Sequence, residues 1–324
     1  MARPYYDEDY YDDEYYRPRR PRRRRRRRRG GKLILLLTVL LVLGGLYMIK
    51  NGGARVLLAP DENIVRDFQV DLDALAARIT PEMAAAAGTL GQAEAAELSS
   101  AAEEARGERA EMLEFMAAHI GIYTEEAYKT ALVTPEKTAF ALLTPFMSED
   151  PGGADAAIEV EEGELPYLLQ YDSRWAWHGY GSSYMGYTAC GPTCLSMAAI
   201  GLTGNASYTP AYVADWAEAN GHYVPGAGTA WTLFTDGAAA FGLRGEAISA
   251  GRADLEDRLE RGEVIVASML PGDFTTSGHF ILIVSSGALG FRVYDPNSVA
   301  LTERYWSYDT LAPQIAQLWA LSAA

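Results

Sequence analysis

The feature that most constrains this chain is an uncharged apolar run near its N-terminus. Leu33 to Ile49 spans 17 residues without one charged side chain. As an α-helix with a rise of ~1.5 Å per residue, the run extends roughly 26 Å, close to the thickness of a bilayer's hydrocarbon core. A helix packed in a soluble core would carry a polar stripe, and this run has none. We therefore expect residues 33–49 to form a transmembrane helix.

The charges on the two sides of this run are strongly asymmetric. The chain holds 28 Lys and Arg residues against 43 Asp and Glu residues, a net charge of −15. Residues 1–50 carry +8, mostly from the arginines between Arg17 and Arg29, whereas residues 51–324 carry −23. The positive-inside rule places the basic end in the cytoplasm. We expect a single-pass protein of the cell membrane, with a cytoplasmic N-terminus and an extracellular C-terminal domain.

Residues 1–32 join an acidic, tyrosine-rich stretch to the arginine block, a composition typical of a disordered cytoplasmic tail. A docking or tyrosine-phosphorylation segment is an alternative interpretation. The block Arg17–Arg29 is also suited to contact with anionic lipid headgroups. A cleaved signal peptide competes with the anchor, but such peptides have a shorter basic region and a small-residue cleavage site. The acidic remainder argues against nucleic acid as a partner.

The stretch after the anchor is rich in helix-forming residues. Ala, Glu, Leu and Met dominate residues 92–120. Thr124 and Thr134 are each followed by proline or acidic residues, which is typical of a helix start. We expect a helical spacer over residues 51–147 and a Gly/Asp/Glu-rich linker over residues 148–164. This region contains no metal-ligand spacing, phosphate loop or catalytic set.

The composition changes again at residue 165, and the last segment, residues 165–324, is rich in Tyr and Trp and holds both cysteines. Short apolar runs predict strands at Val264–Leu270, His279–Val284 and Phe291–Tyr294. Helical patterns cover Cys190–Leu202, Pro210–Asn220, Trp231–Phe241 and Ala253–Arg261. Helices precede strands, so the expected fold class is α+β. Two cysteines exclude a disulfide scaffold and a four-cysteine zinc site.

One of the cysteines has the surroundings of a nucleophile. Cys190 is followed by Gly191 and Pro192 and then by an apolar helical pattern, which places it at the positive end of a helix dipole. His279 begins a predicted strand, and Asp295 ends the next one. Adjacent antiparallel strands would bring this histidine and carboxylate together. A base oriented by a carboxylate completes the logic of a catalytic triad.

These residues also carry a resemblance to a known family. The blocks PYLLQYDSRW, ACGPTCLSMAAIGLTG, SGHFILIV and VYDPNS, in this order, resemble the C39-like peptidases, which are papain-like cysteine peptidases. The resemblance spans about residues 165–298. It implies that Cys190 is the nucleophile, His279 the general base and Asp295 the residue that orients it, with no cofactor and no metal. Gln170 matches the glutamine that stabilises the oxyanion, although it lies 20 residues before the cysteine, whereas the family's glutamine usually lies a few residues before it.

Several side chains allow two interpretations. Cys194 stands where the family more often has a small hydroxyl residue, and is either a buried apolar side chain or a partner of Cys190 in a regulatory disulfide. The aromatic residues of the segment either line a substrate cleft or cover the core: Trp175, Trp177, Tyr180, Tyr184 and Tyr187. We expect His178 and His222 to be polar loop residues rather than ligands.

The sequence therefore predicts a membrane-anchored, outward-facing cysteine peptidase that hydrolyses a peptide or protein substrate. Two alternatives remain. The domain is a non-catalytic cell-envelope binding module, or it carries out a different papain-like reaction, as a transglutaminase or acyltransferase does. Rapid alkylation of Cys190 at neutral pH, slowed when His279 is replaced, would distinguish an enzyme from a binding module. An amine-acceptor assay would distinguish hydrolysis from transfer.

Overall fold

The computed structural model describes residues 68–83, 90–147, 158–160 and 163–324. The predicted transmembrane run and the arginine block lie outside these residues. Within the described part of the chain, no helix combines the length and the apolar character needed to cross a membrane. The expected anchor therefore stays a prediction.

The first described region is a helical segment that comprises residues 68–83 and 90–147. Its α-helices are α2 (Leu72–Ala76), α4 (Gln92–Glu104), α5 (Glu108–Ala118), α6 (Glu125–Val133) and α7 (Thr138–Leu143). The 3-10 turns η2 (Ile120–Ile122), η3 (Pro135–Lys137) and η4 (Thr144–Phe146) connect or extend them. Thr124 accepts a hydrogen bond from Ala127 N and caps α6, which confirms this predicted helix start.

The second region, residues 163–324, begins with short elements and two helices that precede its main sheet. They are β1 (Gly179–Tyr180), β2 (Ser183–Tyr184), α8 (Met185–Thr188), α9 (Cys190–Thr203), α10 (Pro210–Ala219), β3 (Tyr223–Val224) and β4 (Gly228–Thr229). Helix α9 follows the predicted apolar pattern and ends at Gly204, whose φ of 73° is left-handed. Thr209 caps α10, and Pro210 occupies its first turn, as the sequence pattern indicates.

The rest of the chain builds the main sheet. Its strands are β5 (Leu243–Ile248), β6 (Val264–Met269), β7 (His279–Gly287), β8 (Gly290–Tyr294), β9 (Tyr305–Trp306) and β10 (Ile315–Ala323). The order across the sheet is β5-β10-β6-β7-β8-β9, and every pairing is antiparallel. The turns η6 (Trp231–Phe234) and η7 (Gly237–Phe241) precede β5. Between the strands lie α11 (Arg252–Glu260), α12 (Val299–Thr302), α13 (Tyr308–Leu311) and η8 (Ala312–Gln314). Mixed helices with an antiparallel C-terminal sheet fit the predicted papain-like α+β fold.

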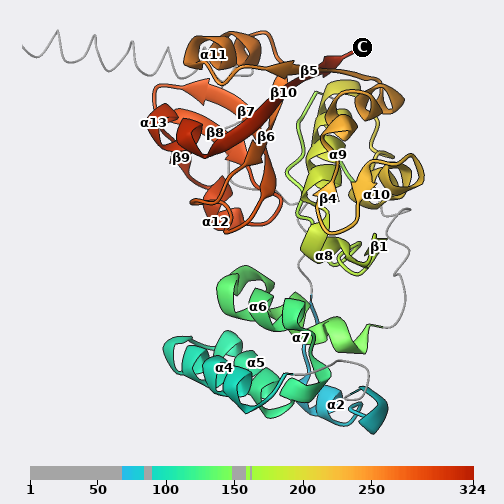
Figure 1. The fold of residues 1–324 in the computed structure, drawn as a ribbon, viewed down its shortest axis with the longest axis vertical. Helices are drawn as coiled ribbons and strands as arrows, with labels where there is room; N and C mark the ends of the chain where they lie inside the picture. The colour runs from blue at the N-terminus through green and yellow to red at the C-terminus, as the bar shows by residue number, and fades with distance from the viewer. Residues whose placement is uncertain (1–67, 84–89, 148–157, 161–162) are drawn as a thin grey trace, which may run out of the picture. The chain divides into compact units, whose positions relative to one another are not determined.

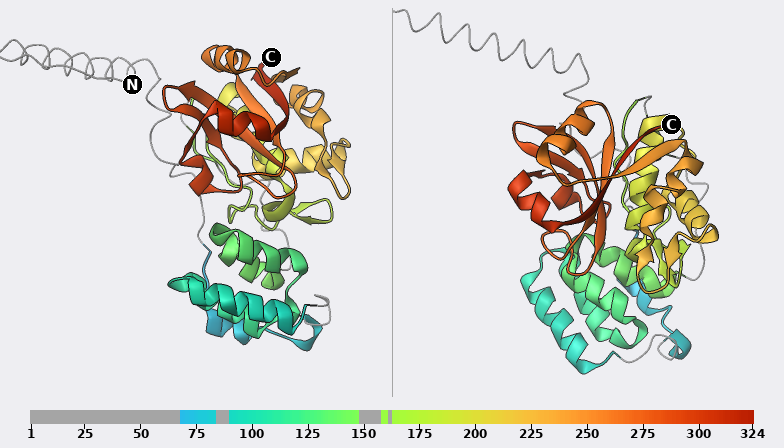
Figure 2. Two further views of the ribbon diagram at one scale, coloured as in Figure 1. Left: turned by 60° about the vertical axis from the view of Figure 1, so that its left-hand side comes forward. Right: turned by 45° about the horizontal axis from the view of Figure 1, so that its top comes forward.

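Side chains on both faces of this sheet are buried, as the unbroken burial of β6 indicates. Val264 and Val266 face the core that includes α9, whereas Ile265 faces a second core with α11. The strands of this sheet, drawn in orange and red, lie beside helix α9, and α10 packs on α9 (Figures 1 and 2). The first core also contains Leu113 of the helical segment, so one apolar cluster joins that segment to α9.

One predicted helix is different in the structure. Residues 231–241 form two 3-10 turns, η6 and η7, rather than one α-helix. The break falls at Thr235, and Gly237 follows it, so two residues with poor helix propensity interrupt the pattern. The strands β5 and β10 were not predicted. Strand β10 is rich in Ala and Leu, and it is extended because it pairs with β5 on one side and β6 on the other.

Candidate active site

Cys190 is the first residue of α9, at the helix end where backbone N–H groups and the helix dipole favour negative charge. Its side chain is partly buried and hydrogen-bonds to His279. Burial alone would raise the pKa of the Cys190 thiol. The charge and hydrogen bond of His279, with the backbone N–H groups of Phe280 and Gly191, outweigh that effect and bring this pKa below its ordinary value.

His279 begins β7 and is buried, with 8% of its surface exposed. Its Nε2 lies 2.7 Å from Asp295 Oδ1, so Nδ1 is the ring nitrogen left for the Cys190 sulfur. Burial alone would lower the pKa of His279. The charges of Asp295 and of the Cys190 thiolate, with hydrogen bonds to both, raise it to about 10. A lowered thiol pKa beside a raised imidazole pKa favours a thiolate–imidazolium pair.

Asp295 follows β8 and is fully buried. Because Leu282 of β7 pairs with Tyr294, the residue after Tyr294 lies beside the start of β7. Its backbone is fixed at both ends: Asp295 N donates to Thr302 Oγ1 at 2.8 Å, and Tyr167 OH donates to Asp295 O at 2.7 Å. The structure thus brings Cys190, His279 and Asp295 together in the order that a catalytic triad requires.

The two oxygens of Asp295 have different surroundings. Oδ1 accepts from His279 Nε2 and, at 2.8 Å, from Asn297 N. Oδ2 is buried and has no hydrogen-bond partner among the residues that the structure describes. Burial removes the hydration of a carboxylate. When one of its oxygens accepts no hydrogen bond, the ionised form therefore depends on nearby positive charge for its stability.

Gln170 is also buried, but its amide nitrogen is already engaged. Nε2 donates to Gly186 O at 3.0 Å and to Met185 O at 3.4 Å, so it supports the short helix α8 just before Cys190. Its backbone N donates to Pro296 O at 2.8 Å, which ties it to the Asp295 loop. The oxygen Oε1 has no partner within the described ranges. The role of Gln170 at the oxyanion stays a prediction.

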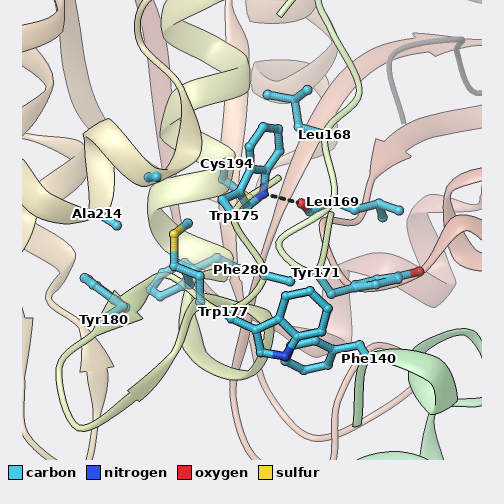
Figure 3. Close-up of a cluster of buried hydrophobic side chains, with 14 of the residues drawn as sticks. Phe140, Leu168, Leu169, Tyr171, Trp175, Trp177, Tyr180, Cys194, Ala214 and Phe280 are labelled. Atoms are coloured by element: carbon cyan, nitrogen blue, oxygen red, sulfur yellow. Dashed lines mark hydrogen bonds between the residues drawn. The ribbon is translucent and has the colours of Figure 1, made fainter. Parts of the chain in front are cut away.

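The remaining candidates from the sequence are placed as follows. Cys194 is fully buried among aromatic side chains (Figure 3), where burial raises the pKa of its thiol well above the ordinary value. Both cysteines are free thiols.

The aromatic candidates are mostly buried. Trp175 and Trp177 are buried, and Trp175 Nε1 donates to Leu169 O at 2.8 Å. Tyr180 is buried as well, so these three rings belong to the core rather than to an open cleft. Tyr184 and Tyr187 are half-buried.

The other histidines have structural contacts. His178 Nε2 lies 2.6 Å from Asp215 Oδ1, and His222 Nδ1 lies 2.9 Å from Thr232 Oγ1 while its ring stacks on Trp216. Across the described part of the chain, no cluster of three or more His, Cys, Asp or Glu side chains is arranged to hold a metal ion.

Residues 163–323 match the Peptidase_C39 like family. The match supports a C39-like peptidase domain. The matched residues include the whole of the main sheet, α9, and all three residues of the Cys190–His279–Asp295 cluster. No curated protein matches the chain. The match supports a cysteine peptidase or a related enzyme.

Proposed function

We propose that the protein is a cysteine peptidase that hydrolyses peptide or amide bonds at Cys190. The observation that carries this proposal is the continuous contact from Cys190 through His279 to Asp295, in a domain that matches a peptidase family. A thiolate at a helix N-terminus, paired with an imidazolium, is prepared for attack on a carbonyl carbon.

In the proposed reaction the Cys190 thiolate adds to the substrate carbonyl and forms a tetrahedral oxyanion. The His279 imidazolium then gives its proton to the leaving amine, and a thioester to Cys190 remains. Neutral His279 next accepts a proton from water, whose oxygen attacks the thioester and releases the acid. Asp295 keeps the ring in position and stabilises its charged form. The backbone N–H of Cys190 is suited to stabilise the oxyanion, and Gln170 is the second candidate donor.

The proposed location follows from the sequence. If residues 33–49 anchor the chain and the arginine block stays in the cytoplasm, the C39-like domain acts outside the membrane on a peptide or protein substrate. Protease treatment of intact cells tests this placement. An outward domain is digested while a tag at the N-terminus is protected, whereas an inward domain survives until the cells are lysed.

The activity is tested in two steps. Iodoacetamide should alkylate Cys190 of the full-length protein at neutral pH much faster than an ordinary thiol, and His279→Ala should slow this labelling. A peptide mixture is then incubated with the wild type and with Cys190→Ala, and the products are identified by mass spectrometry. Fast labelling with no cleavage, but with products joined to an added amine, would favour transferase chemistry. Labelling at the rate of an ordinary thiol would favour a binding module.

A further inference from the structure

The loop that carries Asp295 is held from outside the C39-like domain. The contacts come from η3, the 3-10 turn Pro135–Lys137, which lies in the helical segment and precedes the family match by more than twenty residues. Two consecutive side chains of this turn, Glu136 and Lys137, hydrogen-bond to residues 297–300, which follow Asp295 in the same loop.

Lys137 is an unusual lysine because only 3% of its surface is exposed. Its Nζ donates to Asn297 Oδ1 at 2.9 Å. The ammonium also lies 5.7 Å from the ring centroids of both Tyr171 and Tyr187, and 5.9 Å from that of Phe140. Aromatic faces attract a cation, but they replace only part of its lost hydration. Burying an ammonium in such a position costs desolvation free energy, which other contacts must offset.

The hydrogen bond from Lys137 continues toward the catalytic histidine. Asn297, which accepts from Lys137, donates its backbone N–H to Asp295 Oδ1 at 2.8 Å. The same Oδ1 accepts from His279 Nε2 at 2.7 Å. Since Asp295 Oδ2 has no hydrogen-bond partner among the described residues, the nearby ammonium also supplies positive charge to a carboxylate that needs it.

Glu136 fixes the next part of the same loop. Its carboxylate accepts from Ser298 Oγ at 2.8 Å, from Val299 N at 2.9 Å and from Ala300 N at 3.2 Å. Tyr171 OH donates to it at 3.1 Å. Charge-assisted hydrogen bonds of this kind are stronger than neutral ones, so Glu136 determines where the chain turns into α12.

We propose that Glu136 and Lys137 are positioning residues of the active site, and that the helical segment is therefore part of the catalytic unit rather than only a spacer. Together they fix residues 297–300, and through Asn297 they fix Asp295 and the ring of His279. The inference rests on the proposed function, since it concerns the geometry of the same Cys–His–Asp cluster. Neither residue touches the reacting atoms.

The test uses alkylation of Cys190 by iodoacetamide in the full-length protein, followed as rate against pH. Other charged or titratable groups that face Lys137 are Glu126 of α6, Cys190 of α9, Asp295, and the phenols of Tyr171 and Tyr187. Removing the ammonium makes the Cys190 thiolate less favourable. Lys137→Met should therefore move the acid limb of the profile to higher pH and slow labelling about tenfold on that limb.

One control variant and a second test variant separate positioning from folding. Lys129→Met removes an exposed lysine of α6 that pairs with Glu125, and it should leave the profile unchanged. Glu136→Gln keeps the side chain's shape but weakens its hydrogen bonds, and it should slow labelling in the same direction as Lys137→Met. Thermal melts accompany each variant. If Lys137→Met does not fold, Asn297→Ala removes the same hydrogen bond from its other end.

The double variant Lys137→Met with Asn297→Ala tests whether Lys137 acts on the active site through Asn297. If Lys137 acts through Asn297, the double variant should label little more slowly than the slower single variant. The proposal is overturned if the folded variants of Glu136, Lys137 and Asn297 all give the wild-type profile. That result differs from failure of the proposed function, in which the wild-type Cys190 itself would react at the rate of an ordinary thiol.

Discussion

His279 Nε2 lies 2.7 Å from Asp295 Oδ1, and both side chains are buried where β7 begins and β8 ends, at the end of this strand pair opposite its turn. This contact fixes one ring nitrogen of the imidazole on a carboxylate and leaves the other for the Cys190 sulfur. The same contact contributes to the raised pKa of His279, and the imidazolium in turn lowers the pKa of the Cys190 thiol. The chemistry of the site therefore depends on a small number of mutually dependent contacts.

The first prediction concerns pH. Hydrolysis needs the Cys190 thiolate as nucleophile and the His279 imidazolium as acid. The rate should rise as pH increases through the lowered pKa of Cys190 and fall as pH passes about 10, where His279 loses its proton. Initial rates of peptide cleavage across this range measure both limbs. A rate that keeps rising with pH beyond the second limb would show that the imidazolium is not needed.

The second prediction is that Asp295→Asn lowers activity by at least about 100-fold, because the neutral amide neither holds the same tautomer nor stabilises the imidazolium. The alkaline limb should also move to lower pH, since the charge of Asp295 is a main cause of the raised His279 pKa. Comparing the pH profiles of the two proteins checks both effects. An unchanged alkaline limb would mean that Asp295 does not control the ionisation of His279.

The sequence predicted the core of this arrangement because local patterns mark it. A glycine and a proline after Cys190 indicate a helix start, and the apolar runs that begin at His279 and at Phe291 indicate neighbouring strands. The pairing of Leu282 with Tyr294 then brings His279 and Asp295 together. The two strands follow each other closely in the chain, so pattern and spacing are enough to predict that His279 and Asp295 meet. The approach of Cys190 to this pair was implied by the resemblance to the C39-like peptidases.

Other features depend on contacts that no local pattern records. Strand β10 has the composition of a helix and is extended by its two neighbouring strands. The contact of Lys137 with Asn297 joins residues 160 positions apart. At the level of sequence, residues 134–136 indicate only a helix start, and nothing near Lys137 suggests a buried lysine. The aromatic rings of Trp175 and Tyr180 could not be assigned to core or cleft because burial is a property of the fold.

The third prediction concerns Cys194, which is fully buried and whose thiol pKa is raised by burial and by the neighbouring Cys190. Iodoacetamide should label only Cys190 in the native protein, and both cysteines in urea. Mass spectrometry of labelled peptides counts and locates the modifications. Cys194→Ala should retain the labelling rate of Cys190 and should lower the free energy of unfolding by about 1 kcal/mol, because a small buried group is lost. Activation by a reducing agent would instead support the disulfide.

The fourth prediction tests the close approach beside the nucleophile. A Cβ added at Gly191 would lie 2.6 Å from Thr229 Oγ1 and 2.7 Å from two carbons of the same side chain. Gly191→Ala should therefore displace strand β4 and lower the free energy of unfolding by about 1–3 kcal/mol, as overpacking does. Urea unfolding measures this change.

The matched variant for this test is Thr229→Gly, which removes all the atoms that the new methyl group would meet. In that background, Gly191→Ala should lower the free energy of unfolding much less than it does in the wild type. The clash is gone, and alanine is the better helix residue at this position in α9. Equal losses of unfolding free energy in the two backgrounds would mean that contact with Thr229 is not the reason for the glycine.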